Sequence, residues 1–334
     1  MDYRPFGGTG MKVSRLGIGG VSFGAWGETD HEKAVGVIRA AIAGGINLID
    51  TSDAYSQGES EEIIGKALAG GRRDGVILAT KFHMPGDVRW DEPGGDPNKR
   101  GNGRRWLIEA VEASLRRLQT DWIDLYQAHQ PEPGTDFEET LSALTDLRTA
   151  GKIRAFGTSN FAAHELVESQ WTAERRALGR FVSEQAPYSM VVRSIEQDVI
   201  PVAERHRLAL LPWSPLAGGW LSGRYRKGGE IPQSSRKELM PERYNMELAE
   251  NQAKLDVVDQ LGQLADEAGI TLVHMSLAFL LAQPVVTAPL IGPRTLDQLE
   301  TQLGAVDVRL SQDVLDRIDE IVPRGVTVAP NDLH

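Results

Sequence analysis

The chain has 334 residues, of which 41% are hydrophobic, and it carries a formal net charge of -11 at pH 7. This acidic balance argues against nucleic acid and anionic membranes as partners, because both need clustered Lys and Arg, and it favours a small-molecule ligand. The absence of cysteine excludes disulfides, thiolate metal sites and cysteine nucleophiles, and without a signal peptide or an apolar run of about 20 residues we predict a cytoplasmic protein with no membrane span.

The first elements predicted along the chain are a hairpin and a series of strands and helices. Residues 3–16 place GGTG between two short stretches of mixed polarity, which is typical of a β-hairpin. Apolar, β-rich runs follow and alternate for the most part with helix-period segments, several of which end in Gly. These runs are residues 15–20, 46–50, 75–81, 122–129, 153–159, 180–185, 208–214 and 285–292.

Eight strands, each followed by a helix, predict an α/β fold: a (β/α)8 TIM barrel in a single domain over residues 1–334. The alternative is a doubly wound nucleotide-binding fold, but no GxGxxG follows any predicted strand. Two long connections, residues 83–104 and 217–245, are expected to shape a pocket at the C-terminal mouth of the barrel. Residues 247–281 predict two helices separated near Gly269, and residues 311–322 predict an extra C-terminal helix.

Four titratable side chains fall at the ends of consecutive predicted strands. Asp50 ends the second strand, Lys81 the third and His129 the fourth, and Tyr55 lies just beyond Asp50. Strand ends converge on one rim of a barrel, where such groups can transfer a proton to a carbonyl oxygen. An ammonium at Lys81, offset by Asp50, is expected to lower the pKa of Tyr55 from about 10 towards neutrality. His129 is expected to orient the substrate oxygen.

Each of these residues also has an ordinary structural interpretation. Lys81 could be an ion-paired lysine at a strand end, and Asp50 could cap its loop through DTSD. Tyr55 could be an amphipathic rim residue, and His129 could occupy a turn. The shared position of all four at one rim favours the catalytic interpretation.

Six ordered motifs resemble the aldo-keto reductase family, in particular the bacterial branch that includes the potassium-channel β subunits. They are DTSDAY at 50–55, TKF at 80–82, SLRRLQTDWIDLYQAHQPEP at 114–133, GKIRAFGTSNF at 151–161, WSPLAGGWLSGRY at 213–225 and IGPRTLDQL at 291–299. The resemblance covers essentially the whole chain and implies a (β/α)8 barrel with an N-terminal hairpin and NAD(P)H-dependent carbonyl reduction. It also implies a catalytic tetrad with Tyr55 as general acid: Asp50, Tyr55, Lys81 and His129.

Residues suited to a dinucleotide follow the later strands. Trp213 offers an aromatic plane, which by resemblance stacks on the nicotinamide. Also by resemblance, the carboxamide is bound by Ser159, Asn160 and Gln185. The small residues of SPLAGGWLSGRY let backbone N–H groups approach a pyrophosphate. In this segment the resemblance implies contacts from Ser214, Leu216, Gly218 and Arg224.

The last predicted strand is followed by a candidate site for the adenosine end of the cofactor. Gly292 and Arg294 precede a helix predicted to begin at Thr295 or Leu296. A helix N-terminus beside a guanidinium suits a ribose 2′-phosphate, so we predict NADPH in preference to NADH. The family usually continues QxxEN, whereas this chain has Gln298 followed by Thr301 and Gln302. We expect adenine contacts from Gln298 more than from Gln302.

The pocket for a small carbonyl substrate is predicted to have Phe23, Trp26 and His83 as walls, since such pockets are mostly apolar. The leading hypothesis is reduction of an aldehyde or ketone to an alcohol. A redox-sensing module that binds nicotinamide, like the channel β subunits, is the alternative; a hairpin that begins at Asp2 or Tyr3 argues against it. A metal-dependent hydrolase or aldolase is not expected, because the seven histidines form no HxH pattern.

Overall fold

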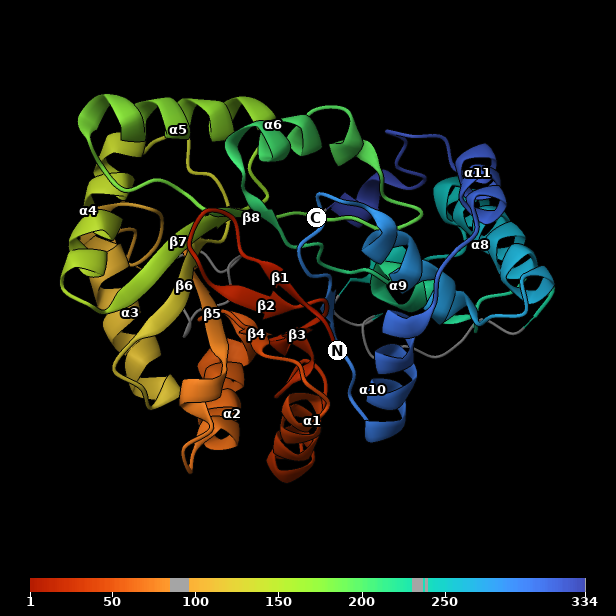
Figure 1. Cartoon of the computed structure of the whole chain (residues 1–334), viewed down its shortest axis with the longest axis horizontal. Coiled ribbons are helices and arrows are strands. Elements are labelled where there is room, and N and C mark those ends of the chain that lie inside the picture. Colours follow the sequence, from red (N-terminus) through yellow and green to blue (C-terminus); the bar gives the residue numbers. More distant parts are fainter. Residues whose placement is uncertain (85–95, 230–236, 238–239, 334) are drawn as a thin grey trace.

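Figure 1 shows the computed structural model of the protein, which describes residues 1–84, 96–229, 237 and 240–333. Eight parallel strands form one sheet in the order β10-β3-β4-β5-β6-β7-β8-β9. Their bounds are β3 Gly17–Gly19, β4 Leu48–Asp50, β5 Ile77–Phe82, β6 Ile123–Ala128, β7 Ile153–Ser159, β8 Ser183–Gln185, β9 Ala209–Leu210 and β10 Leu290–Ile291. Thr287 N–H donates to Leu210 O (2.9 Å) and Leu290 N–H to Pro212 O (2.8 Å), so the two ends of the sheet meet and close the predicted barrel.

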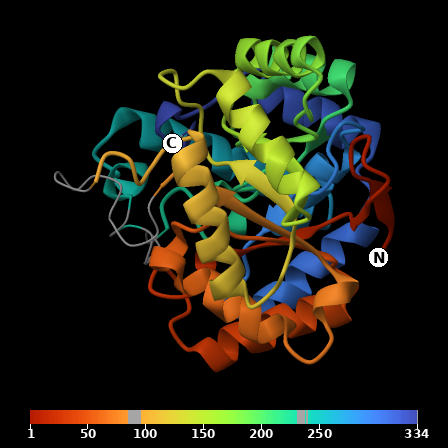
Figure 2. The ribbon, with the colours of Figure 1, turned by 90° about the vertical axis from the view of Figure 1, so that its left-hand side faces the viewer.

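Helices cover the outside of the sheet (Figures 1 and 2). Their bounds are α1 His31–Ala43, α2 Glu59–Leu68, α3 Arg104–Leu118, α4 Phe137–Thr149, α5 Ala163–Arg176, α6 Val199–His206, α8 Ala249–Glu267, α9 Leu272–Ala282, α10 Leu296–Leu303 and α11 Gln312–Ile321. The first helix shows how the sequence sets them: the Asp30 side chain caps α1 by accepting from two backbone N–H groups, and Ala34, Ile38 and Ala41 recur on its buried face. The predicted break near Gly269 and the predicted terminal helix are both confirmed.

The barrel interior has an apolar lower layer and a polar upper layer. The lower layer includes Leu48, Ala79, Leu125, Ala155 and Leu211. Phe6, from the predicted hairpin of β1 (Tyr3–Pro5) and β2 (Lys12–Ser14), joins this layer and covers the N-terminal end. Side chains alternate along a strand, so the residues two positions later also face inward. Asp50, Lys81 and Gln127, two positions after Leu48, Ala79 and Leu125, therefore face inward at the C-terminal mouth.

The later strands are shorter than the sequence predicts. Residues 208–214 and 285–292 were expected as strands, but regular pairing is limited to β9 and β10, of two residues each. Pro212 and Pro289 lack the N–H that a ladder needs, which limits both strands. Of the two long connections expected to shape the pocket, residues 85–95, 230–236 and 238–239 lie outside the described residues.

In the described part of the chain, no single helix has the length and apolar character needed to cross a membrane, and only α8 and α9 taken together, bent by 92°, pass that test.

Candidate functional site

Three neighbouring strands and one turn carry the predicted catalytic residues. Asp50 is the last residue of β4, Lys81 is near the end of β5, and His129 directly follows β6. Tyr55 begins a 3-10 turn, Tyr55–Gly58, between β4 and α2. The backbone of this segment stays beside β5, because Asp53 N–H donates to Lys81 O at 3.2 Å. All four side chains therefore meet at the mouth of the barrel.

Lys81 is the centre of the group, and its side chain is fully buried. Its Nζ donates to Asp50 Oδ2 at 2.6 Å, to Thr51 O at 2.8 Å and to the Tyr55 hydroxyl at 3.2 Å. These three bonds use all the N–H groups of the ammonium. Burial disfavours the charge, but Asp50 and Tyr55 outweigh it, so the pKa of Lys81 is raised and the ammonium stays protonated.

The second carboxylate oxygen of Asp50 is bound by two glutamine side chains. Asp50 Oδ1 accepts from Gln127 Nε2 and from Gln185 Nε2, both at 2.9 Å. The carboxylate is thus fully hydrogen-bonded in the barrel interior, as a buried charge requires. Gln185, predicted to bind a carboxamide, also contacts the tetrad through this bond.

The pKa of Tyr55 moves in the direction opposite to the one expected from sequence. Burial raises it, and the Lys81 ammonium, which lowers it, does not offset this effect. The expectation of a lowered Tyr55 pKa is therefore wrong, because the sequence does not show how closely Tyr55 is surrounded. A phenol with a raised pKa stays protonated at pH 7, as a proton donor must, and the nearby ammonium stabilises the phenolate left after donation.

His129 stands edge-on to Tyr55, with ring centroids 5.7 Å apart and planes at 80°. Its Nδ1 lies 3.1 Å from Ser52 Oγ. Burial lowers the pKa of His129 well below its ordinary value, and the charges of Lys81 and His83 add to this effect. His129 is therefore neutral at pH 7 and can orient a carbonyl oxygen beside the Tyr55 hydroxyl.

The three predicted pocket walls have different positions. Trp26 is half-buried beside Tyr55, with ring centroids 6.2 Å apart, and is suitably placed at the mouth. Phe23 has no exposed surface and belongs to the main apolar core. His83 is also buried, and its ring nitrogens contact Asn102 Oδ1 (2.9 Å) and Gln130 Nε2 (2.7 Å). Both nitrogens are thereby used in joining two loops, which leaves none for a substrate.

The residues predicted to face a nicotinamide lie at the ends of β7, β8 and β9. Asn160 has a left-handed backbone, φ 61°. Its Nδ2 donates to His129 O and its Oδ1 accepts from Trp213 Nε1, at 3.1 and 3.0 Å. Ser159 Oγ donates to Gln185 O at 2.9 Å. The half-buried Trp213 is thus connected through Asn160 to the backbone of His129.

The segment after β9 is shaped by left-handed residues. The φ angles of Ser214, Ala217, Gly218 and Gly219 are 51°, 48°, 67° and 102°. These residues form a tight turn, which we call the Gly218 cradle, closed by hydrogen bonds from Ala217 N–H to Ser214 O and from Gly219 N–H to Leu216 O, both at 2.8 Å. Tyr244 holds this cradle by donating from its hydroxyl to Gly218 O at 2.8 Å. Around it lie the half-buried Leu216 and the exposed Arg224.

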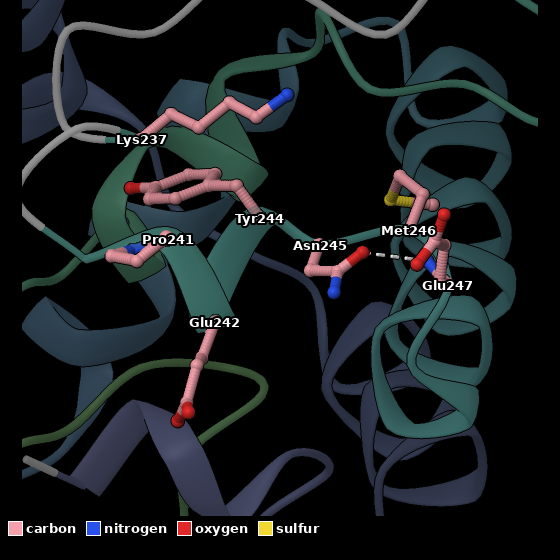
Figure 3. A pocket seen from close by; sticks show the side chains of 7 residues that line it. All are labelled: Lys237, Pro241, Glu242, Tyr244, Asn245, Met246 and Glu247. Carbon is pink, nitrogen blue, oxygen red and sulfur yellow. Dashed lines mark hydrogen bonds between the residues drawn. The ribbon is translucent and has the colours of Figure 1, made fainter.

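Figure 3 shows a hollow lined by residues of the connection between β9 and α8. Its lining consists of Lys237, Pro241, Glu242, Tyr244, Asn245, Met246 and Glu247. None of the tetrad residues is among them. The hollow adjoins the Gly218 cradle through Tyr244, whose hydroxyl donates to Gly218 O.

The candidate adenosine site lies where β10 passes into α10. The helix begins at Leu296, as predicted, with the Thr295 hydroxyl accepting from Gln298 N–H at 3.3 Å. Gln298 Oε1 accepts from Arg294 N–H at 2.9 Å, which fixes the turn that follows Gly292. Gln302 is buried, and its Oε1 has no hydrogen-bond partner in the described residues. Gln298 is exposed and Gln302 is buried, and the expected order of their adenine contacts stays a prediction.

Sequence reasoning missed Gln127, Ser52 and Asp53. Gln127 was detectable, because it stands two residues before His129 on the same inward face of β6. Ser52 and Asp53 were interpreted only as part of a loop-capping motif, and no residue spacing indicates that Ser52 contacts both His129 and Asp53. In the described part of the chain, no three His, Cys, Asp or Glu side chains are grouped closely enough to hold a metal ion.

Comparison with known proteins identifies the family. The sequence model described as Aldo/keto reductase family matches residues 15–323. The chain belongs to the aldo/keto reductase family. Among its relatives is the uncharacterized oxidoreductase YrpG of Bacillus subtilis, 36% identical over 97% of this chain and 96% of the relative.

Two further relatives show the breadth of this family. The aldo-keto reductase YhdN of Bacillus subtilis is 36% identical over 90% of this chain and 87% of its own length. A probable voltage-gated potassium channel subunit beta of Arabidopsis thaliana is 34% identical, over 96% of this chain and 97% of the relative. Aldo/keto reductases are oxidoreductases that generally reduce carbonyl compounds with nicotinamide cofactors. The barrel mouth, where the four predicted catalytic side chains meet, is therefore the candidate active site.

Proposed function

We propose that this aldo/keto reductase reduces an aldehyde or ketone to an alcohol with NADPH, and that Tyr55 donates the proton. The observation that carries the proposal is the 3.2 Å hydrogen bond from Lys81 Nζ to the Tyr55 hydroxyl. It joins a proton donor to a buried ammonium, which is itself held by Asp50 at 2.6 Å. A lysine with only a structural role would be satisfied by its bond to Asp50, whereas Lys81 also donates to the hydroxyl of the half-buried Tyr55.

The mechanism follows from these contacts. When bound, the reduced nicotinamide supplies a hydride to the carbonyl carbon. His129 and Tyr55 bind the carbonyl oxygen between them. As negative charge develops on that oxygen, the Tyr55 hydroxyl transfers its proton to it. Lys81 stabilises the resulting phenolate, and Asp50 keeps Lys81 charged.

The side chains at the mouth fit a dinucleotide. Trp213 offers an aromatic face for the nicotinamide, and Asn160 and Ser159 offer amide and hydroxyl groups for its carboxamide. The cradle of left-handed residues around Gly218 suits the pyrophosphate. Arg294, at the N-terminus of α10, suits a 2′-phosphate and supports NADPH over NADH.

Steady-state assays test this proposal. Purified protein is incubated with NADPH and a panel of aldehydes and ketones, and consumption of the reduced cofactor is followed by absorbance, in parallel with NADH. We expect turnover on at least one carbonyl and a kcat/KM about tenfold or more higher for NADPH, the effect of one good charged contact. Equal or better use of NADH would overturn the cofactor assignment.

A second candidate is a module that binds the cofactor and reports its redox state to a partner protein. The observation that favours it is the 34% identity with a probable potassium channel subunit beta. It predicts tight cofactor binding without turnover on any carbonyl of the panel, which the same assays detect when combined with a binding titration.

A further inference from the structure

A hydroxyl and a carboxyl group lie behind the catalytic histidine. Ser52 Oγ is 3.1 Å from His129 Nδ1, 3.1 Å from Asp53 Oδ1, and 3.2 Å from the backbone nitrogen of Ala54. Ser52 and Asp53 are both buried. The role of this chain of contacts rests on the proposed function, in which His129 orients the carbonyl oxygen.

The hydrogen-bond protons shared among His129, Ser52 and Asp53 can be counted. A serine hydroxyl has one proton to donate and two lone pairs to accept. The N–H of Ala54 takes one lone pair, so one of the two remaining neighbours must donate to Ser52 Oγ and the other must accept from it. If Asp53 accepts, His129 carries its proton on Nδ1 and has a bare Nε2. If Asp53 donates, His129 accepts at Nδ1 and carries its proton on Nε2.

The surroundings of Asp53 favour the second arrangement. Its Oδ2 is buried and has no hydrogen-bond partner in the described residues, a costly state for an ionised carboxylate. The nearby Arg117 does not serve it, because its Nε donates to Glu61 Oε2 at 2.6 Å. Burial raises the pKa of Asp53 well above its ordinary value and the Glu61 carboxylate adds to this effect, while Arg117, Ser52 and the backbone of Ala54 oppose it. A neutral carboxyl at Asp53 therefore fits these surroundings better than a carboxylate.

We infer that Asp53 is a positioning residue: as a neutral carboxyl it donates to Ser52, Ser52 donates to His129 Nδ1, and His129 thereby presents an Nε2–H group to the substrate oxygen. An imidazole with a bare Nε2 would repel a carbonyl oxygen instead of binding it. The choice between these two tautomers is made by a residue that does not touch the substrate.

Two spectroscopic measurements test the inference on the full chain at pH 7. Nitrogen-15 NMR of labelled histidine, with the His129 signals assigned by their loss in His129→Gln, should show a proton on Nε2 and an acceptor at Nδ1. Infrared difference spectra between the wild type and Asp53→Asn should show the loss of a protonated carboxyl band. A proton on Nδ1 of His129, or the loss of an ionised carboxylate band instead, would overturn the inference.

Variants test the role of the Ser52 and Asp53 contacts in turnover. Ser52→Ala should move the Nδ1 resonance to that of an unbonded nitrogen and lower kcat about tenfold, since an imidazole without its orienting partner is a poorer catalyst. Asp53→Ala should lower kcat similarly, and Asp53→Asn, which keeps a neutral N–H donor, should rescue most of it. Ser169→Ala removes an equally buried hydroxyl in α5 and serves as the control for a purely structural loss.

The result for Asp53→Asn also separates the two proton arrangements. If the amide variant is as impaired as Asp53→Ala, an ionised carboxylate is needed and the inference fails. Because the spectra require no substrate, they also distinguish this failure from a failure of the proposed function. A protein without carbonyl turnover but with an Nε2–H tautomer would refute the function and leave the positioning chain intact.

Discussion

Lys81 is the residue on which the site depends most, because its buried ammonium joins an acid, a phenol and a backbone carbonyl. Replacing it with Met keeps the length of the side chain and removes the charge. Asp50 is then left as a buried carboxylate with only two amide donors. We expect the free energy of unfolding to fall by about 3 kcal/mol, since a buried charge without its partner is costly.

Urea unfolding of Lys81→Met measures this loss, and Lys33→Met is a matched control. Lys33 is an exposed lysine, 70% accessible, whose Nζ lies 3.7 Å from Asp30 Oδ2. Exposed pairs of this kind contribute less than about 1 kcal/mol. Equal losses for the two variants would show that the Lys81–Asp50 pair is not the buried charge pair described here.

For single residues, the sequence predicted which side chains meet at the barrel mouth, because strand geometry alone determines their positions. Asp50, Tyr55, Lys81 and His129 were placed together because strand ends of a parallel barrel converge. The pKa direction of Tyr55 was predicted wrongly, because it depends on a balance between burial and one nearby charge. The burial of Phe23 and the use of both ring nitrogens of His83 likewise depend on packing between distant segments.

Among the elements, β8 and the turn after β7 are joined by a buried carboxyl. Thr158 Oγ1 lies 2.5 Å from Glu184 Oε2 and 3.1 Å from Ser183 O, and Phe161 N–H donates to Glu184 Oε1 at 3.2 Å. The single hydroxyl proton of Thr158 cannot serve both oxygens, which fits a protonated Glu184. Burial raises the pKa of Glu184 from 4.5 to about 8.

This raised pKa predicts the sign of a pH effect on stability. Since the folded state binds the Glu184 proton more tightly, its contribution is complete below about pH 4.5 and is lost as the pH rises through about 8. Glu184→Gln, a neutral residue of the same shape, should remove this loss. Unfolding free energies at pH 5.5, 7 and 8.5 should therefore fall more steeply in the wild type than in Glu184→Gln. The exposed Glu168→Gln should keep the wild-type slope.

The Gly218 cradle makes a prediction about ligand binding. A Cβ at Gly218 would lie 2.6 Å from the Tyr244 hydroxyl, and the residue has φ +67°. Gly218→Ala should therefore displace the cradle and raise the Kd for NADPH about tenfold, with a smaller effect on kcat. Gly10, with φ +82° and open space around it, shares the backbone strain without the clash. Gly10→Ala should lower stability by about 1 kcal/mol and leave the Kd unchanged.

Elements were predicted more reliably from sequence than their ends. All eight barrel strands, the hairpin and the two C-terminal helices around Gly269 follow from periodicity and turn residues. The predicted lengths of β9 and β10 were too great. The apolar runs that contain Pro212 and Pro289 are buried, but most of their residues have irregular backbone. Periodicity detects burial, and it does not detect whether the backbone pairs.

In the whole molecule, a second buried ion pair joins the C-terminal segment to the barrel. Lys254 Nζ, on α8, donates to Asp332 Oδ1 at 3.0 Å and Oδ2 at 3.1 Å, and it lies 4.4 Å from the centre of the Trp220 ring. Trp220 is part of the segment that follows β9, and Tyr244 stacks on it. The pair therefore connects the C-terminal segment to the same connection that forms the cradle.

A double-mutant cycle tests this connection. Asp332→Asn leaves a buried ammonium without its counter-ion and should lower the free energy of unfolding by about 3 kcal/mol. Adding Lys254→Met removes the unpaired charge, so the double variant should be more stable than Asp332→Asn alone. Additive losses would mean that the two side chains act independently.

The most direct test of the central claim is the Tyr55→Phe variant, which removes one hydroxyl from the mouth of the barrel. NADPH affinity and the single-turnover rate of carbonyl reduction are measured on the same preparation. We expect a Kd within about twofold of the wild type and a rate lower by about a hundredfold or more, the usual effect of losing a general acid. A variant that binds NADPH and turns over at the wild-type rate would contradict this expectation.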